Sequence, residues 1–300
     1  MHELRIDDPD YPALLRRSPD APKLLYVHGA VERLWHPAIA IVGSRRATAG
    51  GLDNARGWAR AFVRAGWSVA SGMAAGVDTA AHLGALDAGG PTVAVLGTGI
   101  DVPFPASNAA LMADIADRGV VVSEYPPGTP PQPWQFPKRN RIVAGLSLGT
   151  LVVEAQQRSG ALITARLAAD AGREVFAVPG SIRNPMARGC HRLLRDGATL
   201  VESPEEVIAA LAPVAAALAD DLRGRLHVPT SETAAPSHRS PRMDANTQRL
   251  WEALGHDPIP MEVLVARTGL TAAELASILL VMELGGRVVS EHGRYTRKSS

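Results

Sequence analysis

Short apolar runs alternate with longer amphipathic stretches over the first two thirds of the chain. The runs are rich in Val, Ile, Leu and Ala, which is typical of strands buried on both faces of a sheet. They predict strands at 24–29, 38–45, 67–72, 92–97, 119–125, 152–153, 174–180 and near 199. The stretches between them predict helices at 52–65, 77–88, 107–117, 161–171 and 191–195. This alternation forms βαβ units, so we expect an α/β fold with a doubly wound, mostly parallel, Rossmann-like sheet.

The pattern changes on either side of this alternation. Residues 1–22 have too little apolar periodicity for a domain, so we expect them to be a lead-in to a core that covers 23–212. Residues 213–243 are rich in Ala, Pro, Ser, Thr and charge, which predicts a flexible linker. Residues 244–300 predict three helices followed by a hairpin, the arrangement of a winged helix.

The third helix of this second domain, predicted at 271–284, begins with Thr271 and Glu274 in capping-box spacing. In a winged helix it would enter a major groove, but its readable positions carry no Arg or Lys. The basic residues stand in and around the hairpin instead: Arg287, Arg294, Arg297 and Lys298. Two roles remain open for this domain, contact with a protein and contact with the backbone of duplex DNA.

A basic cluster interrupts the alternation in the middle of the chain. Lys138, Arg139 and Arg141 follow Pro137, which we expect to block helix formation upstream, and Asn140 can cap a helix start. The helix dipole would then favour negative charge beside three cations, which predicts a phosphate site. The alternative is a solvated basic loop that caps a helix, because charge runs usually face water.

Small residues end nearly every predicted strand, and they should gather at one edge of the sheet. Arg158, Ser159 and Gly160 open a helix at that edge, where open α/β sheets bind ligands. Glycine permits close approach of the backbone to a ligand, although it also simply ends strands. The strand ends are Gly43-Ser44-Arg45, Ser71-Gly72-Met73, Gly97-Thr98-Gly99, Ser123-Glu124 and Pro179-Gly180-Ser181.

Composition limits the possible functions. Of 300 residues, 46% are hydrophobic and 20% are charged, as in an ordinary folded protein. Lys and Arg number 31 against 30 Asp and Glu, so any nucleic-acid surface must be a local patch. The single cysteine, Cys190, excludes an internal disulfide and a cysteine-based zinc site. Without a signal peptide or an apolar run of roughly 20 residues, we expect a cytoplasmic protein with no membrane partner.

The nucleotide-binding motifs of known enzyme classes are incomplete. Gly97 and Gly99 follow a predicted strand and Glu124 ends the next one, as in a dinucleotide-binding unit. Val102 stands where that fingerprint needs its third glycine, so the tight packing of helix on strand is lost. No GxxxxGK sequence followed by Ser or Thr is present. These departures argue against an NAD site and exclude a P-loop NTPase.

Two pairs of titratable residues are candidates for chemistry. Asp78 and His82 are spaced i, i+4 on one predicted helix, and such a pair is more often a structural hydrogen bond than a catalytic pair. His191 follows Cys190, but no oxyanion loop accompanies them, so we expect this pair to be inert. We therefore assign no catalytic residue, no cofactor and no metal.

Long motifs occur in order along the first domain: IVGSRRAT at 41–48, SGMAAGVDTAAHLGAL at 71–86, VLGTGIDVPFPASNAAL at 95–111, SEYPPGTPPQPWQFPKRNRIVAGLS at 123–147, VVEAQQRSGALITARLAADAGREVFAVPGSI at 152–182 and GCHRLLRDGATLVES at 189–203. Together they resemble the DprA/Smf family of DNA-processing proteins, over about residues 9–205. The C-terminal part resembles the winged-helix domain that many members carry.

This resemblance implies an extended Rossmann-like core that binds single-stranded DNA during natural transformation. It also implies that the protein protects incoming DNA, forms a homodimer and loads the RecA recombinase, without acting as an enzyme. Residues 1–22 would be the remnant of an N-terminal helical SAM-like domain.

The DNA-contact positions of the family carry over to the predicted sheet edge and the basic cluster. We expect Arg45 and Lys138 to face one another across one groove, with Trp134 and Phe136 as candidates for stacking on bases. The full set of DNA-binding candidates is Gly43, Ser44, Arg45, Arg46, Gly72, Met73, Lys138, Arg139, Arg141, Ser159, Gly160 and Ala161.

A second resemblance provides an enzymatic alternative. The core is also similar to Rossmann-like phosphoribohydrolases that cleave nucleoside monophosphates, because Gly149-Thr150 followed by Glu154 echoes their glycine-rich, acidic signature. The spacing departs from that signature, and its tandem-glycine start is missing. Single-stranded DNA binding is therefore the preferred hypothesis.

Overall fold

The computed structural model describes residues 1–225, 245–254, 259–272, 275, 278–279, 282, 288–291 and 294–297. The chain divides into two compact units, Met1–Val228 and Pro229–Ser300. No helix within these described residues is long and apolar enough to cross a membrane.

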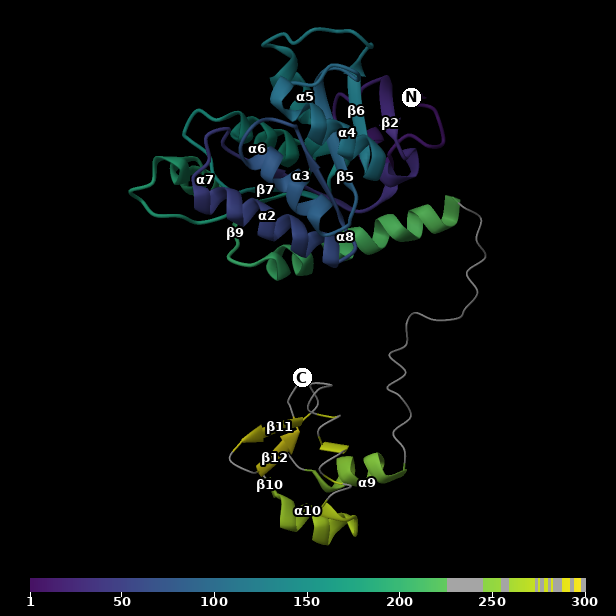
Figure 1. Ribbon diagram of the computed structural model, residues 1–300, viewed down its shortest axis with the longest axis vertical. Helices are drawn as coiled ribbons and strands as arrows, with labels where there is room; N and C mark the ends of the chain where they lie inside the picture. The colour runs from purple at the N-terminus through teal and green to yellow at the C-terminus, as the bar shows by residue number, and fades with distance from the viewer. Residues whose placement is uncertain are drawn as a thin grey trace. The chain divides into compact units, whose positions relative to one another are not determined.

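A nine-stranded sheet with helices on both faces forms the first unit (Figure 1). Its order is β1-β2-β6-β5-β4-β3-β7-β8-β9, parallel from β6 to β9, with β1 and β2 antiparallel at one edge. The predicted doubly wound, mostly parallel sheet is therefore confirmed. The strands are β1 His2–Arg5, β2 Leu24–Gly29, β3 Ala38–Val42, β4 Ser68–Ser71, β5 Thr92–Gly99, β6 Val120–Tyr125, β7 Gly149–Val152, β8 Glu174–Ala177 and β9 Thr199–Leu200.

Apolar side chains on both faces of the strands explain why the sequence shows continuous apolar runs. In β3, Ile39 and Ile41 pack on one face, while Ala40 and Val42 pack on the other. The first face is covered by α2, α3, α4 and α8, and the second by α1, α5, α6 and α7. The helices are α1 Ala13–Arg16, α2 Ala49–Arg64, α3 Val77–Asp87, α4 Ala109–Arg118, α5 Gln135–Leu146, α6 Gly160–Asp170, α7 Arg188–Arg195 and α8 Pro204–Arg225.

The first 22 residues belong to the core, which corrects the expectation of a lead-in. Strand β1 pairs with β2, and the side chains of Tyr11 and Leu15 are fully buried. The Tyr11 hydroxyl donates a hydrogen bond to the carbonyl oxygen of Pro22 at 2.7 Å. The segment is too short for a visible apolar period, and long-range pairing with β2 and α5 fixes its structure instead.

Helix α5 begins earlier than the sequence predicted. It starts at Gln135, so Pro137 lies in its first turn instead of upstream of the helix. Proline is tolerated there because the first amides of a helix have no intrahelical acceptor. Asn140 consequently lies inside the helix and does not cap it.

Helix α8 replaces the first part of the predicted linker. It continues through Pro213 to Arg225, and Leu211, Ala215 and Leu218 are buried against the first face of the sheet. The composition of this stretch, rich in Ala and Pro, led to the wrong prediction of a linker. Its buried residues nevertheless repeat at helical spacing. The remainder of the predicted linker lies outside the described residues.

The second unit contains α9 Ala245–Ala253, α10 Met261–Thr268 and a three-stranded sheet of order β10-β12-β11. Its strands are β10 Ile259–Pro260, β11 Val288–Glu291 and β12 Arg294–Arg297. This is the predicted winged helix, with β10 as a third strand that the sequence did not indicate. Most of the predicted third helix, with Arg287 and Lys298, lies outside the described residues. Arg297 stacks on the ring of Trp251 at 4.5 Å and so contributes to the fold of this unit.

Replacement of Leu218 tests whether α8 belongs to the core. Leu218→Ala should lower the free energy of unfolding by about 2–4 kcal/mol, because it leaves a cavity beneath the helix. Val214→Ala, on the exposed side of the same helix, should change it by less than about 0.5 kcal/mol. Urea unfolding of the full chain measures both, and equal effects would indicate a linker that does not pack.

Candidate functional site

The order of the strands creates a crevice between β3 and β7. From β3 the chain winds through β4, β5 and β6 in one direction, and then returns to place β7 on the other side of β3. Open α/β sheets bind ligands at such a switch point, beyond the carboxyl ends of the strands. The loops 43–48 and 153–159 leave the sheet there.

A groove of about 550 Å³ opens at this point, bordered by the starts of α5 and α6. It brings together most of the predicted site. The predicted residues that line it are Gly43, Ser44, Arg45, Arg46, Gly72, Arg139, Ser159, Gly160 and Ala161. Further lining residues, absent from the predicted set, include Phe104, Phe136, Asn140, Gln156, Arg158 and Ile163.

The amino terminus of α2 is already occupied by a carboxylate of the protein. Glu154, which follows β7, accepts hydrogen bonds from the Thr48 amide at 2.9 Å and the Thr48 hydroxyl at 2.8 Å. Asn184 donates a third at 3.2 Å. A side chain at Gly51 would meet this carboxylate, because a Cβ there would lie 2.5 Å from Glu154 Oε2. Glu154 therefore joins the loops after β3, β7 and β8 and leaves no room for an external anion at α2.

The amino terminus of α6 is open to the groove. Ser159 caps it and accepts a hydrogen bond from the Ala161 amide at 3.3 Å, and the exposed Gly160 begins the helix. The first turn of α6 contains no acidic residue. Helix termini of this kind attract anions through free amides and the helix dipole. A phosphate group is therefore suited to this end of the groove.

Three exposed arginines surround this terminus. Arg45 and Arg46 project from the loop after β3, and Arg158 precedes the cap of α6. Within residues 1–225 none of the three forms an ion pair. The Arg45 guanidinium lies 5.9 Å from the ring centroid of Phe136, which in turn packs against Phe104 at 4.9 Å. The groove thus combines free cations with an aromatic wall.

Arg139 forms the floor of the groove. Arg139 is 4% exposed, and its guanidinium donates to the carbonyl oxygens of Gly72, which follows β4, and of Val95, within β5. Burial lowers the pKa of its guanidinium to about 10, and the neighbouring Asp78 opposes this shift. Burial raises the pKa of Asp78, which accepts hydrogen bonds from the amides of Gly72 and Ala74. Arg139 is therefore committed to internal contacts, unlike the exposed arginines.

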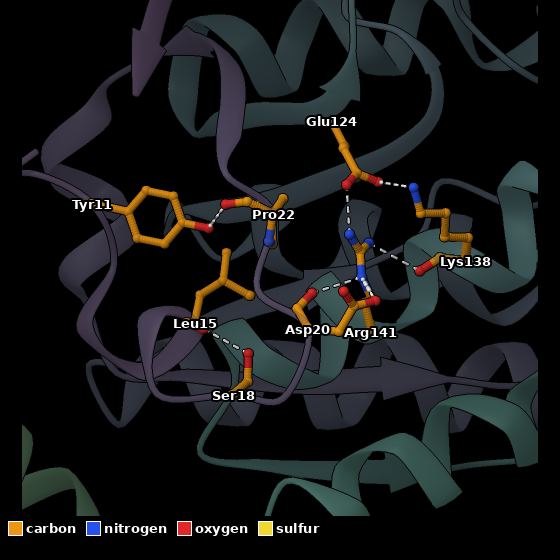
Figure 2. A network of polar contacts seen from close by, with 8 residues as sticks. All are labelled: Tyr11, Leu15, Ser18, Asp20, Pro22, Glu124, Lys138 and Arg141. Atoms are coloured by element: carbon orange, nitrogen blue, oxygen red, sulfur yellow. Dashed lines mark hydrogen bonds and ion pairs between the residues drawn. The ribbon is translucent and has the colours of Figure 1, made fainter. Parts of the chain in front are cut away.

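Lys138 and Arg141 lie outside the lining of the groove. Figure 2 shows Glu124 between them, with Oε2 3.3 Å from Lys138 Nζ and Oε1 2.5 Å from Arg141 Nη2. Arg141 Nε also contacts the carboxylate of Asp20 at 3.0 Å. The expectation that Arg45 and Lys138 face one another across the groove is wrong. Because α5 starts early, Lys138 and Arg141 share one face of the helix and point toward β6 and the N-terminal segment.

The remaining candidates are buried and have structural partners. Met73, a predicted DNA contact, is instead fully buried in an apolar cluster with Leu86 and Ile115. His82 does not bond to Asp78, as the sequence suggested, but lies with Nδ1 2.7 Å from the hydroxyl oxygen of Thr92. Burial lowers the pKa of His82 to about 3. Asp78 and His82 thus have separate partners and do not form the expected pair.

Cys190 and His191 also have separate partners. Burial raises the pKa of the Cys190 thiol to about 11, and its sulfur lies 3.7 Å from the carbonyl oxygens of Val152 and Val153. His191 Nε2 lies 2.9 Å from the carbonyl oxygen of Gly180. Because the thiol stays protonated near neutral pH, this pair lacks a nucleophile.

Comparison with known families matches both units of the chain. A family described as DNA recombination-mediator protein A matches residues 2–212. A second family, described as the DprA winged helix domain, matches residues 232–294. These matches agree with the fold of each unit.

Individual relatives extend this result. Protein Smf of Escherichia coli is 37% identical over 297 residues, 99% of this chain and 77% of its own. The crystal structure of DNA processing protein A from Streptococcus pneumoniae has a TM-score of 0.67 at 44% identity, covering 69% of this chain and 73% of its own. A structure of the Helicobacter pylori protein, which addresses its single-stranded DNA binding mode, has a TM-score of 0.64 at 28% identity. It covers 71% of this chain and 97% of its own.

Replacement of Arg139 tests its role as the floor of the groove. Arg139→Ala should lower the free energy of unfolding by about 3–5 kcal/mol, because Asp78 would stay buried without its cation. The exposed Arg46 provides the matched control, and Arg46→Ala should change stability by less than about 0.5 kcal/mol. Urea unfolding compares the two. If Arg139→Ala unfolds with the same free energy as the unmodified protein, Arg139 does not have the internal structural role assigned to it.

Proposed function

Because the chain belongs to the family of DNA recombination-mediator protein A, or DprA, we propose that it binds single-stranded DNA in the groove at the β3–β7 switch point. The observation that carries this proposal is the group of exposed arginines without ion pairs in residues 1–225, Arg45, Arg46 and Arg158, around the open amino terminus of α6. Phosphates of one strand would bind there through guanidinium groups and backbone amides.

An aromatic wall favours a single strand over a duplex. Phe104 and Phe136 lie against one another beside Arg45, and Phe104 is partly exposed. Bases of a single strand are free to stack on such a surface, whereas the bases of a duplex already stack on each other. Stacking and phosphate contacts carry little sequence information, so we expect binding without strong sequence preference.

The proposed activity is binding without catalysis. The buried charges of the groove are Asp78 and Arg139. They attract each other electrostatically, and each forms hydrogen bonds with backbone groups. Glu154, the acidic residue on which the phosphoribohydrolase alternative depends, is held by Thr48 and Asn184. A carboxylate with these partners is poorly placed to activate water. The enzymatic alternative is therefore not favoured.

Family membership supports three finer proposals. We propose that the chain protects incoming DNA and loads RecA on it during natural transformation, that it works as a homodimer, and that it does so in the cytoplasm. The groove would supply the DNA contact that protection and RecA loading require. The winged helix would then bind a protein or duplex DNA instead of the single strand. Its Arg297 already stacks on Trp251 within the same unit.

Removal of single arginines tests the groove. Arg45→Ala and Arg158→Ala should each weaken binding of single-stranded oligonucleotides of every sequence. Each should also reduce the slope of log K against log salt by about 0.7, the value for one phosphate contact on a single strand. Salt-titrated fluorescence anisotropy with single- and double-stranded probes measures both quantities.

Arg64→Ala is the matched control for this experiment. Arg64 is exposed in the last turn of α2, roughly 24 Å along the helix from the groove, at 1.5 Å per residue. Its removal should leave the affinity and the salt slope unchanged. If Arg64→Ala weakens binding as much as Arg45→Ala and Arg158→Ala do, the DNA is attracted by overall charge and the groove is not the site.

A further inference from the structure

Trp134 is an exposed aromatic residue that the sequence made a candidate for stacking on bases, but it does not line the groove. Its side chain is 58% exposed, whereas Trp35, Trp58 and Trp67 are each less than 9% exposed. The indole stands edge-on against the ring of Tyr125, with 5.9 Å between centroids. Packing thus holds the ring in one orientation while much of its surface faces water. Large exposed aromatic groups of this kind often mark binding surfaces.

Lys138 lies beside this aromatic pair. It follows Trp134 by one helical turn, and its amide donates to the Trp134 carbonyl oxygen at 3.4 Å. The Lys138 ammonium is 6.0 Å from the centroid of the Tyr125 ring, and its side chain is 44% exposed. An aromatic surface beside a partly exposed cation offers what one nucleotide needs, a stacking partner for the base and a charge for the phosphate.

This surface is continuous with the groove. Pro133, Phe136 and Pro137, which flank Trp134 in the sequence, all line the groove. Trp134 and Pro137 are spaced i, i+3 at the start of α5, so their side chains are neighbours on the helix surface. A strand that leaves the groove over Pro137 therefore meets Trp134 next. No other occupant has this continuity in its favour.

We propose that Trp134, Tyr125 and Lys138 form a second subsite for single-stranded DNA, next to the groove, and that Glu124 weakens it in the free protein. This inference rests on the proposed function of the groove. It extends the path of the strand beyond the switch point and around the start of α5.

Glu124 sets the strength of the subsite because it competes with a phosphate for Lys138. One of its carboxylate oxygens lies 3.3 Å from the Lys138 ammonium, and the other contacts Arg141 at 2.5 Å. Arg141 has a second carboxylate partner in Asp20, at 3.0 Å (Figure 2). Lys138 can therefore exchange Glu124 for a phosphate while Glu124 keeps Arg141 as its counter-ion.

Oligonucleotides of two lengths separate the subsite from the groove. A probe of about 4 nucleotides fills one site, and a probe of about 12 reaches both, within the range known for single-strand binding proteins. Trp134→Ala should weaken binding of the long probe by about 5- to 100-fold, as expected for one lost stacked base, and leave the short probe unaffected. Trp134→Phe should restore most of the loss, because phenylalanine also stacks.

Each outcome of this comparison has a definite meaning. If Arg45→Ala does not weaken the short probe, the proposed function of the groove fails. If Arg45→Ala weakens both probes but Trp134→Ala leaves the long probe unchanged, the groove stands and the second subsite is wrong. If Trp134→Ala weakens both probes equally, Trp134 acts by shaping the start of α5, which also overturns the subsite.

Glu124 provides a test in the opposite direction. Glu124→Gln keeps a hydrogen-bond acceptor for Arg141 but removes the charge that restrains Lys138. It should tighten binding of the long probe by about two- to fivefold, because a partly exposed ion pair is weak. In a Lys138→Met background the same change should have no effect. Unchanged or weaker binding in Glu124→Gln, or equal tightening in both backgrounds, would overturn the role of Glu124.

Discussion

Two helices begin at the switch point of the sheet, and the different occupation of their amino termini determines the site. At α2 the protein supplies its own anion, because the Glu154 carboxylate bonds to Thr48 and fixes the loop after β3. At α6 the first turn carries no acid, and the helix is capped by the neutral hydroxyl of Ser159. A fold that filled both termini would have no place for a phosphate. Glu154 thereby leaves α6 as the terminus at which we propose that phosphates bind, and it holds the loop that carries Arg45 and Arg46.

The basic residues of α5 illustrate how clustering in sequence differs from clustering in space. Arg139 is buried beside Asp78, and Lys138 and Arg141 turn to Glu124 on β6. Buried cations need such partners, since an unpaired charge in the interior is costly. The cations without an ion pair within residues 1–225 that border the groove come instead from loops after β3 and β7. Helix α5 thus contributes the floor of the groove through Arg139 and part of its aromatic wall through Phe136, whereas the exposed cations come from the loops.

Much of the fold follows from the sequence, because strands buried on both faces give unmistakable apolar runs and glycines end them at one edge. The groove was predictable for the same reason. The side of α5 on which each cation lies could not be predicted in this way, because it depends on the residue at which the helix begins. The sequence predicts a start after Pro137, whereas the helix begins at Gln135. Residues 1–22 and α8 were misjudged because contacts distant in sequence stabilise them. Arg158 lines the groove but is not among the predicted DNA-binding residues, although its position just before a helix whose first turn has no acidic residue was the available signal.

We propose above all that one strand of DNA passes along the groove and over the aromatic wall of Phe104 and Phe136. Photo-crosslinking of an oligonucleotide that contains 5-iododeoxyuridine, followed by mass spectrometry of the peptides, tests it most directly, because this base reacts with the aromatic rings on which it stacks. We predict adducts on Phe104 or Phe136, lost when unlabelled single-stranded DNA competes and retained when duplex competes. Adducts confined to residues 245–297 would contradict the account and place the single-strand site in the winged helix.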